Sequence, residues 1–293
     1  MKEIVVISGK GGTGKTSVTA SFAVLAGDDA IIADCDVDAA DMHLLMNPEI
    51  EKSENFFSGV AAKIDENKCT NCSICADVCR FNAISVINNQ HSINSLNCEG
   101  CGYCEKVCPV EAISMQEQNV GDWYISKTKI GNTMVHAKLG IGAENSGKLV
   151  AKVKNEAKRL AKDNNKDYII IDGSPGIGCP VVSSLSGASY VVLVTEPSLS
   201  GLHDLKRAYT LVKKFNLKAG CIINKYDINT DVTKDIIKFL NEESINHIAS
   251  LPYDENFTKA MTFGQTIVEY DTGVLKELIV DSWKHIKELV KSN

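Results

Sequence analysis

A glycine-rich segment near the N-terminus has the residues and spacing of a phosphate-binding loop. Residues 9–16 read Gly-Lys-Gly-Gly-Thr-Gly-Lys-Thr, which matches the pattern G-x-x-x-x-G-K-[ST]. The glycines let backbone N–H groups turn onto phosphate oxygens, and the following helix adds its positive end. Lys15 is expected to reach the β- and γ-phosphates, and Thr16 to ligate Mg²⁺. The residues expected to bind ATP or ADP here are Gly9, Lys10, Gly11, Gly12, Thr13, Gly14, Lys15, Thr16 and Ser17.

Carboxylates that follow apolar runs are expected to complete a catalytic centre. Asp172 ends the run Tyr-Ile-Ile-Ile-Asp and is expected to hold Mg²⁺ through water. Asp36 follows the run 30–34, with Asp38 and Asp41 nearby but less assignable. A carboxylate at a strand end can also be a solvated terminus. The phosphate-binding loop is what favours the metal role of Asp172.

Two further residues are candidates for contact with the base. Asn224 ends the apolar run 219–224, and its amide could pair with the N6 and N7 edge of adenine. The same side chain could instead cap the helix expected near 230. Pro252 follows the run that begins at 247, and it is expected to pack on the adenine ring.

Eight of the eleven cysteines fall in two runs that share the spacing C-x₂-C-x₂-C-x₃-C. This spacing is typical of bacterial ferredoxins with two 4Fe–4S clusters, in which the fourth cysteine of each run binds the other cluster. Zinc is the competing metal. Arg80 replaces the usual proline after the first run and removes no ligand. The expected ligand sets are Cys69, Cys72, Cys75 and Cys108 for one cluster, and Cys98, Cys101, Cys104 and Cys79 for the other.

The remaining cysteines have other expected roles. Cys35 and Cys221 lie in apolar strand contexts, which is typical of small core residues. Cys179 follows Asp172 by seven residues. A structural role is expected for Cys179, and a cluster-ligating role is the alternative.

Composition and charge exclude several classes of protein. The formal net charge is −6, and two clusters at about −2 each would bring it to about −10. This balance argues against a nucleic-acid partner, which needs a basic face. No run approaches the length of a membrane span, and the N-terminus enters a strand without a signal-peptide pattern. Metal-bound thiolates then indicate a reducing, cytoplasmic setting.

The order of apolar runs predicts the elements that position these residues. Strands are expected at 2–8, 30–34, 168–172, 190–195, 219–224 and 247–252, and helices at 15–27, from about Asn145, and at 201–215, 230–243 and 274–291. This alternation predicts a mostly parallel sheet flanked by helices. A hairpin is expected around Ile130, Gly131 and Asn132. The last helix carries mixed charges on its polar face, which favours core packing over a membrane surface.

The alternation of strand and helix patterns stops between 58 and 117, where two similar halves repeat with a period of about 29 residues. Such an internal duplication marks a separate small unit. The α/β nucleotide-binding domain is therefore expected to be discontinuous, 1–57 and 118–293. The α+β ferredoxin domain, 58–117, is expected to be inserted at a loop, where insertions are tolerated.

The chain resembles the MinD/ParA superfamily of P-loop ATPases with an inserted ferredoxin domain. The segments that carry the resemblance are KGGTGKT, DCDVDAADMHLL, the two cysteine runs, GAENSGKLV, DGSPGIGCPV, VTEPSLSGLHDL and NKYD. The resemblance implies that Lys10 crosses a dimer interface to the partner's phosphates, as an arginine finger does. A solvated loop lysine is the alternative. The resemblance also implies that Asp36 orients or deprotonates the attacking water, and that 173–178 form switch II.

Three functions fit this combination. The first is a nucleotide-dependent homodimer whose ATP-driven closure gates the assembly or transfer of a metallocofactor to a client metalloprotein. The second is an ATP-gated electron donor to a redox client, resembling the nitrogenase iron protein. The third is a positioning ATPase of the MinD or ParA type. We expect the first, with Mg²⁺, ATP or ADP and two 4Fe–4S clusters as cofactors.

Overall fold

The computed structural model describes every residue except 141, 144, 271, 292 and 293. These described residues divide into two compact units: Met1–Glu54, Trp123–Lys138 and Ser146–Asn293 form the first, and Asn55–Asp122 and Leu139–Asn145 form the second. The chain enters the second unit within strand β3 (Glu49–Ile64) and leaves it within β6 (Ile113–Lys127). The expected insert, 58–117, falls inside the second unit. Glu144 of the segment GAENSGKLV lies outside the described residues.

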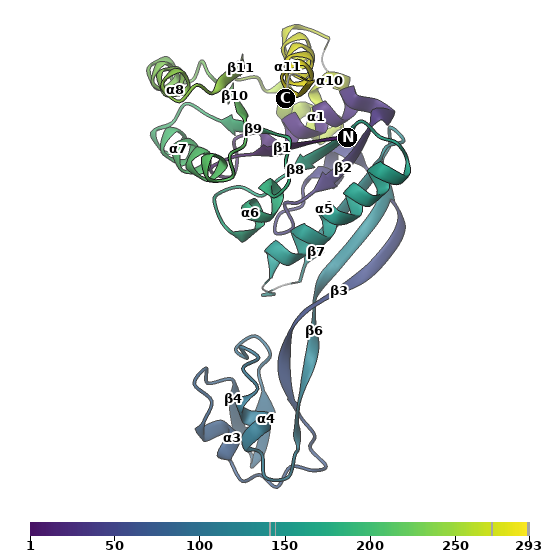
Figure 1. The fold of residues 1–293 in the computed structure, drawn as a ribbon, viewed down its shortest axis with the longest axis vertical. Coiled ribbons are helices and arrows are strands. Elements are labelled where there is room, and N and C mark those ends of the chain that lie inside the picture. The colour runs from purple at the N-terminus through teal and green to yellow at the C-terminus, as the bar shows by residue number, and fades with distance from the viewer. Residues whose placement is uncertain (141, 144, 271, 292–293) are drawn as a thin grey trace. The chain divides into compact units, whose positions relative to one another are not determined.

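A parallel sheet organises the first unit (Figure 1). The described strands follow the order β11-β10-β9-β1-β8-β2-β7-β6-β3. All pairs from β11 to β7 are parallel. Besides β3 and β6, the strands are β1 (Lys2–Ile7), β2 (Ala30–Asp34), β7 (Thr133–Leu139), β8 (Tyr168–Asp172), β9 (Tyr190–Thr195), β10 (Ala219–Asn224) and β11 (Asn246–Leu251).

The register of this sheet brings together the ends of the strands that precede the predicted site residues. In β8, Asp172 is the register partner of Val6 in β1 and of Asp34 in β2. Ligand sites in open α/β sheets form at the carboxyl ends of the strands. The segments that follow β1, β2 and β8 therefore meet at one edge, which is where the phosphate-binding loop begins.

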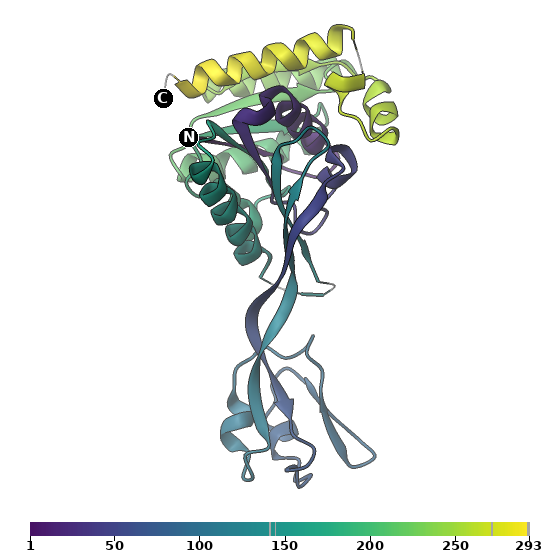
Figure 2. The same ribbon diagram turned by 90° about the vertical axis from the view of Figure 1, so that its right-hand side faces the viewer.

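Helices cover both faces of the sheet, as Figures 1 and 2 show. Buried parallel strands read as continuous apolar runs because both faces are covered. On one face lie α1 (Lys15–Ala26), α10 (Ile267–Tyr270) and α11 (Val274–Lys291), and on the other lie α5 (Ser146–Asp163), α6 (Cys179–Leu185) and α7 (Leu199–Lys214). The remaining helices of this unit are η1 (Gly27–Asp29), α2 (Met42–Met46), α8 (Thr230–Glu242) and α9 (Asn256–Thr262). The expected strands and helices are confirmed, with small shifts at their ends.

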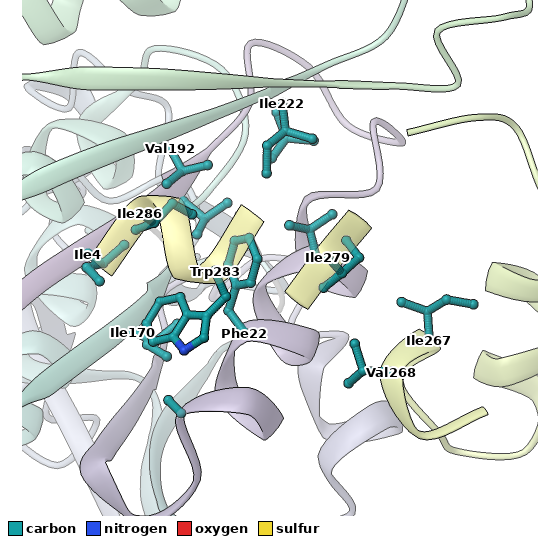
Figure 3. Close-up of a cluster of buried hydrophobic side chains, with 14 of the residues drawn as sticks. Ile4, Phe22, Ile170, Val192, Ile222, Ile267, Val268, Ile279, Trp283 and Ile286 are labelled. Carbon is teal, nitrogen blue, oxygen red and sulfur yellow. The ribbon is translucent and has the colours of Figure 1, made fainter. Parts of the chain in front are cut away.

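The main core joins α1, α11 and the sheet (Figure 3). The rings of Phe22 and Trp283 stack with their centroids 5.5 Å apart. On α11, Ile279 and Ile286 are fully buried in the same cluster. The expectation that the C-terminal helix packs into the core is therefore confirmed. Among the described residues, no helix is both long enough and apolar enough to cross a membrane.

The second unit has short elements around a small core of its own. These are α3 (Ile74–Asp77), α4 (Tyr103–Val107) and the antiparallel pair β4 (Ile84–Ile87) and β5 (Gln90–Ile93). Ala62, Cys75 and Ile113 are buried together, with further cysteines packed against them. The length of β3 was not expected from the sequence, because its side chains are almost all exposed as far as Val60.

The expected hairpin is present between β6 and β7. Residues 128–132 form its turn, in which the Gly131 N–H donates to the Thr128 carbonyl and the Thr128 N–H donates to that of Asn132. Gly131 has a φ of 88°, which favours glycine. This turn places β7 beside β2, with His136 as the register partner of Asp34.

Candidate functional site

The glycine-rich segment forms a tight turn between β1 and α1. Gly14 precedes the first residue of α1 and has a φ of 90°. A Cβ at this position would lie 2.4 Å from Nδ2 of Asn224, so a side chain is excluded on both grounds. Gly11 and Gly12 are exposed, and α1 presents its N-terminus at the turn. This arrangement leaves backbone N–H groups available to an anion.

Lys15 is a buried cation held by carboxylates from two strand ends. Its Nζ lies 2.9 Å from Oδ1 of Asp172 and 3.4 Å from Oδ2 of Asp36. Burial alone would lower the pKa of Lys15, but Asp172, Asp36 and Asp34 together raise it above its usual value. Lys15 therefore stays charged, and the sheet brings together three residues that the sequence predicted for the site.

Asp172 also accepts hydrogen bonds from two threonines of α1. Thr16 Oγ1 donates to Oδ2 over 2.7 Å, and Thr19 Oγ1 donates to Oδ1 over 2.9 Å. A hydroxyl and a carboxylate are the oxygen donors that Mg²⁺ takes alongside water and phosphate. The pair Thr16 and Asp172 therefore fits a magnesium ion. The contact of Thr19 was not expected, and the i+3 spacing from Thr16 was its only sequence signal.

The end of β2 holds two acids with unusual proton affinity. Burial raises the pKa of Asp36 to about 6, although Lys15 acts in the opposite direction. Asp34 is fully buried, and desolvation together with Asp172 raises its pKa well above the usual value. Oδ2 of Asp34 has no hydrogen-bond partner among the described residues. Perturbed acids of this kind cluster at functional sites.

Lys10 makes its contacts within its own chain. Its Nζ lies 2.6 Å from Oε1 of Glu196 and donates to Oγ of Ser198 and of Ser200, each over 3.2 Å. Glu196 also binds Lys225, whose Nζ donates to the Gly12 carbonyl. Sequence reasoning gave Glu196 no role, because nothing local links it to a lysine far away in the chain.

Asn224 braces the phosphate-binding loop. Its Nδ2 donates to the Thr13 carbonyl over 2.9 Å, and its Oδ1 accepts from the Lys225 N–H. The alternative in which Asn224 caps the following helix is wrong, because Asn229 caps α8 through the Val232 N–H. Contact between Asn224 and a base stays a prediction.

Two other residues were predicted to contact the nucleotide: Pro252, on the loop after β11, and Ser17, on α1. The loop after β10 meets the one after β11, where the Tyr226 N–H donates to the Leu251 carbonyl and the Tyr253 N–H to Asp227. Pro252 lies between Leu251 and Tyr253 in the chain and is half-buried. Ser17 Oγ lies 3.7 Å from the Met261 sulfur, on the side of α1 that faces α9.

The cysteines of the second unit line two separate cavities. One cavity is lined by Cys69, Cys72, Cys75 and Cys108, and the other by Cys79, Cys98, Cys101 and Cys104. Each cavity thus combines three cysteines of one run with the fourth of the other. Apolar side chains are among the other lining residues, including Ile64 and Ile113 in the first cavity and Ile84 and Ile93 in the second. Each cavity is thus lined by the four cysteines of one expected ligand set, and their ligation of a cluster stays a prediction.

Local hydrogen bonding in these cavities suits thiolate ligands. The Ala112 N–H donates to the Cys108 sulfur over 3.2 Å, and the Ala62 N–H donates to the Cys98 sulfur over 3.5 Å. Among the described residues, no group of three or more His, Cys, Asp or Glu side chains is placed so that it could hold a single metal ion. A cubane places each cysteine on a different iron, so the residues present fit that group.

The three other cysteines divide as their sequence contexts predict. Cys35 and Cys221 are fully buried, and burial raises the pKa of both thiols. The expectation that they are core residues is confirmed. Cys179 is exposed at the first residue of α6. Its role stays a prediction.

The chain belongs to the CobQ/CobB/MinD/ParA nucleotide-binding family, whose model matches residues 4–267. An uncharacterised protein of Methanocaldococcus jannaschii is 34% identical over 229 residues, covering 78% of this chain and 79% of its own. A second uncharacterised protein of that organism is 27% identical over 92% of this chain and 93% of its own. The fold and the phosphate site therefore define a P-loop nucleotide-binding protein of the MinD/ParA type.

Solved structures share the fold at low sequence identity. The cell-division ATPase MinD of Pyrococcus furiosus superposes with a TM-score of 0.59 at 20% identity, covering 98% of this chain and 99% of its own. MinD of Pyrococcus horikoshii, complexed with Mg-ADP, gives 0.58 at 19%, covering 98% and 96%. The MinC:MinD complex of Aquifex aeolicus gives 0.60 at 17%, with the same coverage. The expected α/β architecture is confirmed at this level.

Proposed function

We propose that this chain hydrolyses MgATP as a nucleotide-dependent homodimer and that two 4Fe–4S clusters reside in its second unit. Its ATP-driven closure gates the assembly or transfer of a metallocofactor to a client protein. The observation that carries the proposal is the presence, in one chain, of a phosphate site built on Lys15 and Asp172 and two cavities that each collect four cysteines.

The phosphate site supplies the groups that hydrolysis needs. In this structure Lys15 is paired with Asp172 and Asp36, and the phosphates of ATP would compete with these carboxylates for Lys15. Thr16 and Asp172 would hold Mg²⁺, which would neutralise negative charge on the phosphates. Asp36 stands on the loop after β2, and a pKa of about 6 leaves it mostly ionised at neutral pH. It can then orient water and accept its proton.

Lys10 supplies the link between hydrolysis and dimerisation. Within its own chain Lys10 contacts the partly exposed carboxylate of Glu196 and two serine hydroxyls. A partner's phosphates could replace these contacts. A second cation brought to the phosphates only by a partner subunit would neutralise charge in the transition state. Hydrolysis then depends on closure of the dimer, which is the property that a gating ATPase needs.

The second unit supplies the iron–sulfur chemistry. The clusters, once bound, supply one-electron redox chemistry and carry iron and sulfide. This chain's own residues would hold them by eight thiolates, with apolar side chains among the lining of each cavity and backbone N–H groups donated to two of the sulfurs. These features support ligation from both halves of the unit.

An ATP-gated electron donor is the second candidate function. The crossed grouping of cysteines favours it, because both halves of the unit must stay folded around both clusters. Clusters held in this way suit a resident electron carrier better than a cargo that is handed over. Side chains of α11 pack in the core of the first unit (Figure 3), which gives no support to membrane binding by this helix in the third function, a positioning ATPase of the MinD or ParA type.

Anaerobic affinity purification with and without ATP tests the choice of function. The full chain is used as bait, and Lys15→Ala serves as the control that cannot respond to ATP. We expect a client that co-purifies in one nucleotide state and is an apo-metalloprotein or a cofactor carrier. A redox enzyme in that position would favour the electron donor, and a client set that ignores nucleotide would contradict gating.

A further inference from the structure

Three pairs of positions that the duplication makes equivalent combine a polar side chain in one half with glycine or alanine in the other. A shift of 29 residues takes Cys69 to Cys98, and it also takes Asn71 to Gly100, Ser73 to Gly102 and Ala62 to His91. The backbone is left-handed at all four loop positions, with φ of 57° and 64° at the first two and 65° and 70° at the glycines. The backbone of the duplicate is thus preserved where its side chains are not.

The three polar residues lie together beside one cavity. His91 is buried and lines the cavity that contains Cys69, Cys72, Cys75 and Cys108. Its Nδ1 lies 3.2 Å from Oδ1 of Asn71, and its Nε2 lies 3.1 Å from Oγ of Ser73. The equivalent position at the other cavity is Ala62, whose methyl side chain can form no such contacts, although its backbone N–H donates to the Cys98 sulfur over 3.5 Å.

The Asn71 side chain also reaches a cysteine. Its Oδ1 lies 3.5 Å from the Cys69 sulfur, which as a thiol donates to it. An iron-bound thiolate has no proton to donate, so a neighbouring amide must present N–H instead. Rotation of the amide by half a turn exchanges its oxygen and nitrogen and places NH₂ between Cys69 and His91. Neutral His91 then accepts at Nδ1 and donates from Nε2 to Ser73.

The second cysteine loop offers no side-chain donor to Cys98, whose sulfur accepts from the Ala62 N–H. Gly100 has no side chain, and a Cβ there would lie 2.3 Å from the Val60 carbonyl oxygen. A residue like Asn71 is therefore excluded at that position by its surroundings. The difference between the loops is built into the packing of the unit.

We propose that Asn71 donates a hydrogen bond to the Cys69 thiolate and that His91 is the positioning residue that orients its amide. This inference rests on the proposed function, because it requires clusters in both cavities. A hydrogen bond to sulfur stabilises the reduced, more negative form of a cluster and so raises its reduction potential. Each set of four cysteines also accepts one backbone N–H, at Cys108 and at Cys98, so Asn71 adds a second donor on one side. The cluster on Cys69, Cys72, Cys75 and Cys108 therefore has the higher potential of the two, and electrons settle there first.

The test is a redox titration of anaerobically purified full-length protein, followed by electron paramagnetic resonance, with iron and sulfide measured on the same samples. Asn71→Gly copies the second loop and is expected to lower one potential while leaving the other unchanged. His91→Ala is expected to shift the same potential in the same direction by less. For a one-electron couple, a tenfold change in the ratio of oxidised to reduced protein corresponds to about 59 mV.

Asn88→Gly is the matched control, because Asn88 is exposed, has a φ of 51° and lies in the turn between β4 and β5. It should leave both potentials unchanged. Two unchanged potentials in Asn71→Gly with full iron content would overturn the inference and leave the proposed function standing. Loss of iron from both Asn71→Gly and His91→Ala would also overturn it, since a positioning role does not hold the cluster. Wild-type protein without iron would instead refute the proposed function.

Discussion

Nζ of Lys10 and Oε1 of Glu196 lie 2.6 Å apart in the same chain. The lysine that the family resemblance assigns to a partner's phosphates is therefore engaged in cis before any partner arrives. Both side chains are partly exposed, and such pairs contribute only about 0–1 kcal/mol. A partner's nucleotide can displace a contact of this strength.

Lys10→Ala is expected to bind ATP with nearly unchanged affinity and to lose turnover. Its charge matters only where the transition state forms, and cations supplied in this way contribute about 10³–10⁵-fold in other P-loop enzymes. Steady-state hydrolysis at saturating ATP and equilibrium binding of a fluorescent analogue measure the two quantities. Ser200→Ala removes one contact that Lys10 makes in its own chain but keeps the charge of Lys10, and it is the matched control. Equal turnover in Lys10→Ala and wild type would rule out the trans role.

Asp36→Asn is expected to bind MgATP and hydrolyse it slowly, because an amide cannot accept the proton of the attacking water. In the wild type, burial raises the Asp36 pKa to about 6, and the ionised form is the active one. Turnover should therefore rise about tenfold per pH unit below 6 and level off above it. Lys15 keeps its charge across this range, since its pKa is raised.

The Asp36→Asn variant also provides the control for the pH profile. Asp36→Asn should show low turnover without the inflection near pH 6, measured with folded protein at each pH. An unchanged inflection in this variant would assign the titration to another group. Wild-type turnover in Asp36→Asn would mean that a different residue positions the water.

Asn224→Ala is expected to weaken binding of both ATP and GTP, and to weaken ATP binding further if the predicted contact with adenine forms. The amide holds the Thr13 carbonyl and accepts from the Lys225 N–H, so its loss loosens the phosphate-binding loop whatever the base. Competition between the two nucleotides at fixed Mg²⁺ gives the ratio of affinities. Asn229→Ala, which removes only the cap of α8, is the control. A selective loss of ATP would instead reveal contact with adenine.

Cys79→Ser and Cys108→Ser are expected to damage opposite clusters. The Cys79 variant should lose the cluster of the second run, and the Cys108 variant that of the first, because each fourth cysteine lines the other run's cavity. Intact protein should contain about eight irons, four per cubane. Iron analysis with spectroscopy distinguishes the two losses. Damage confined to the cluster of the same run would contradict crossed ligation.

The sequence predicted the parts of the fold that follow from local pattern. The apolar run before Asp172 is a buried strand, and its terminal carboxylate meets Lys15 because the motif fixes one and the strand end fixes the other. Strand β3 escaped prediction because most of its length is exposed and polar, so that no alternation marks it. Its conformation depends on pairing with β6, far away in the chain.

The missed contacts share one cause. Glu196 binds Lys10, and Asn224 braces Thr13, across separations that only the order of the strands decides. Asn224 ends β10, and Glu196 follows the neighbouring β9, so both reach the phosphate-binding loop from the same edge of the sheet. Residue type and spacing along the chain indicated polar candidates there without indicating their partners.

The central proposal is that nucleotide at the phosphate site controls the second unit and the clusters proposed to reside in it. Asp36 lies between β2 and the start of β3, the strand in which the chain enters that unit. Linkage requires that any effect be reciprocal: if ATP shifts a reduction potential, reduction shifts ATP affinity by the same free energy. Couplings between sites are typically about 1–3 kcal/mol, or roughly 5–150-fold in affinity.

The measurement is a redox titration of the clusters without nucleotide, with MgADP and with a non-hydrolysable MgATP analogue, with analogue affinity measured on oxidised and reduced protein in parallel. Lys15→Ala, which should not bind the analogue, is the control. We predict a potential that differs between the MgADP and analogue states, and an affinity that changes by the matching factor. Identical potentials in all three states, with identical affinities in both redox states, would contradict the control of the clusters by ATP.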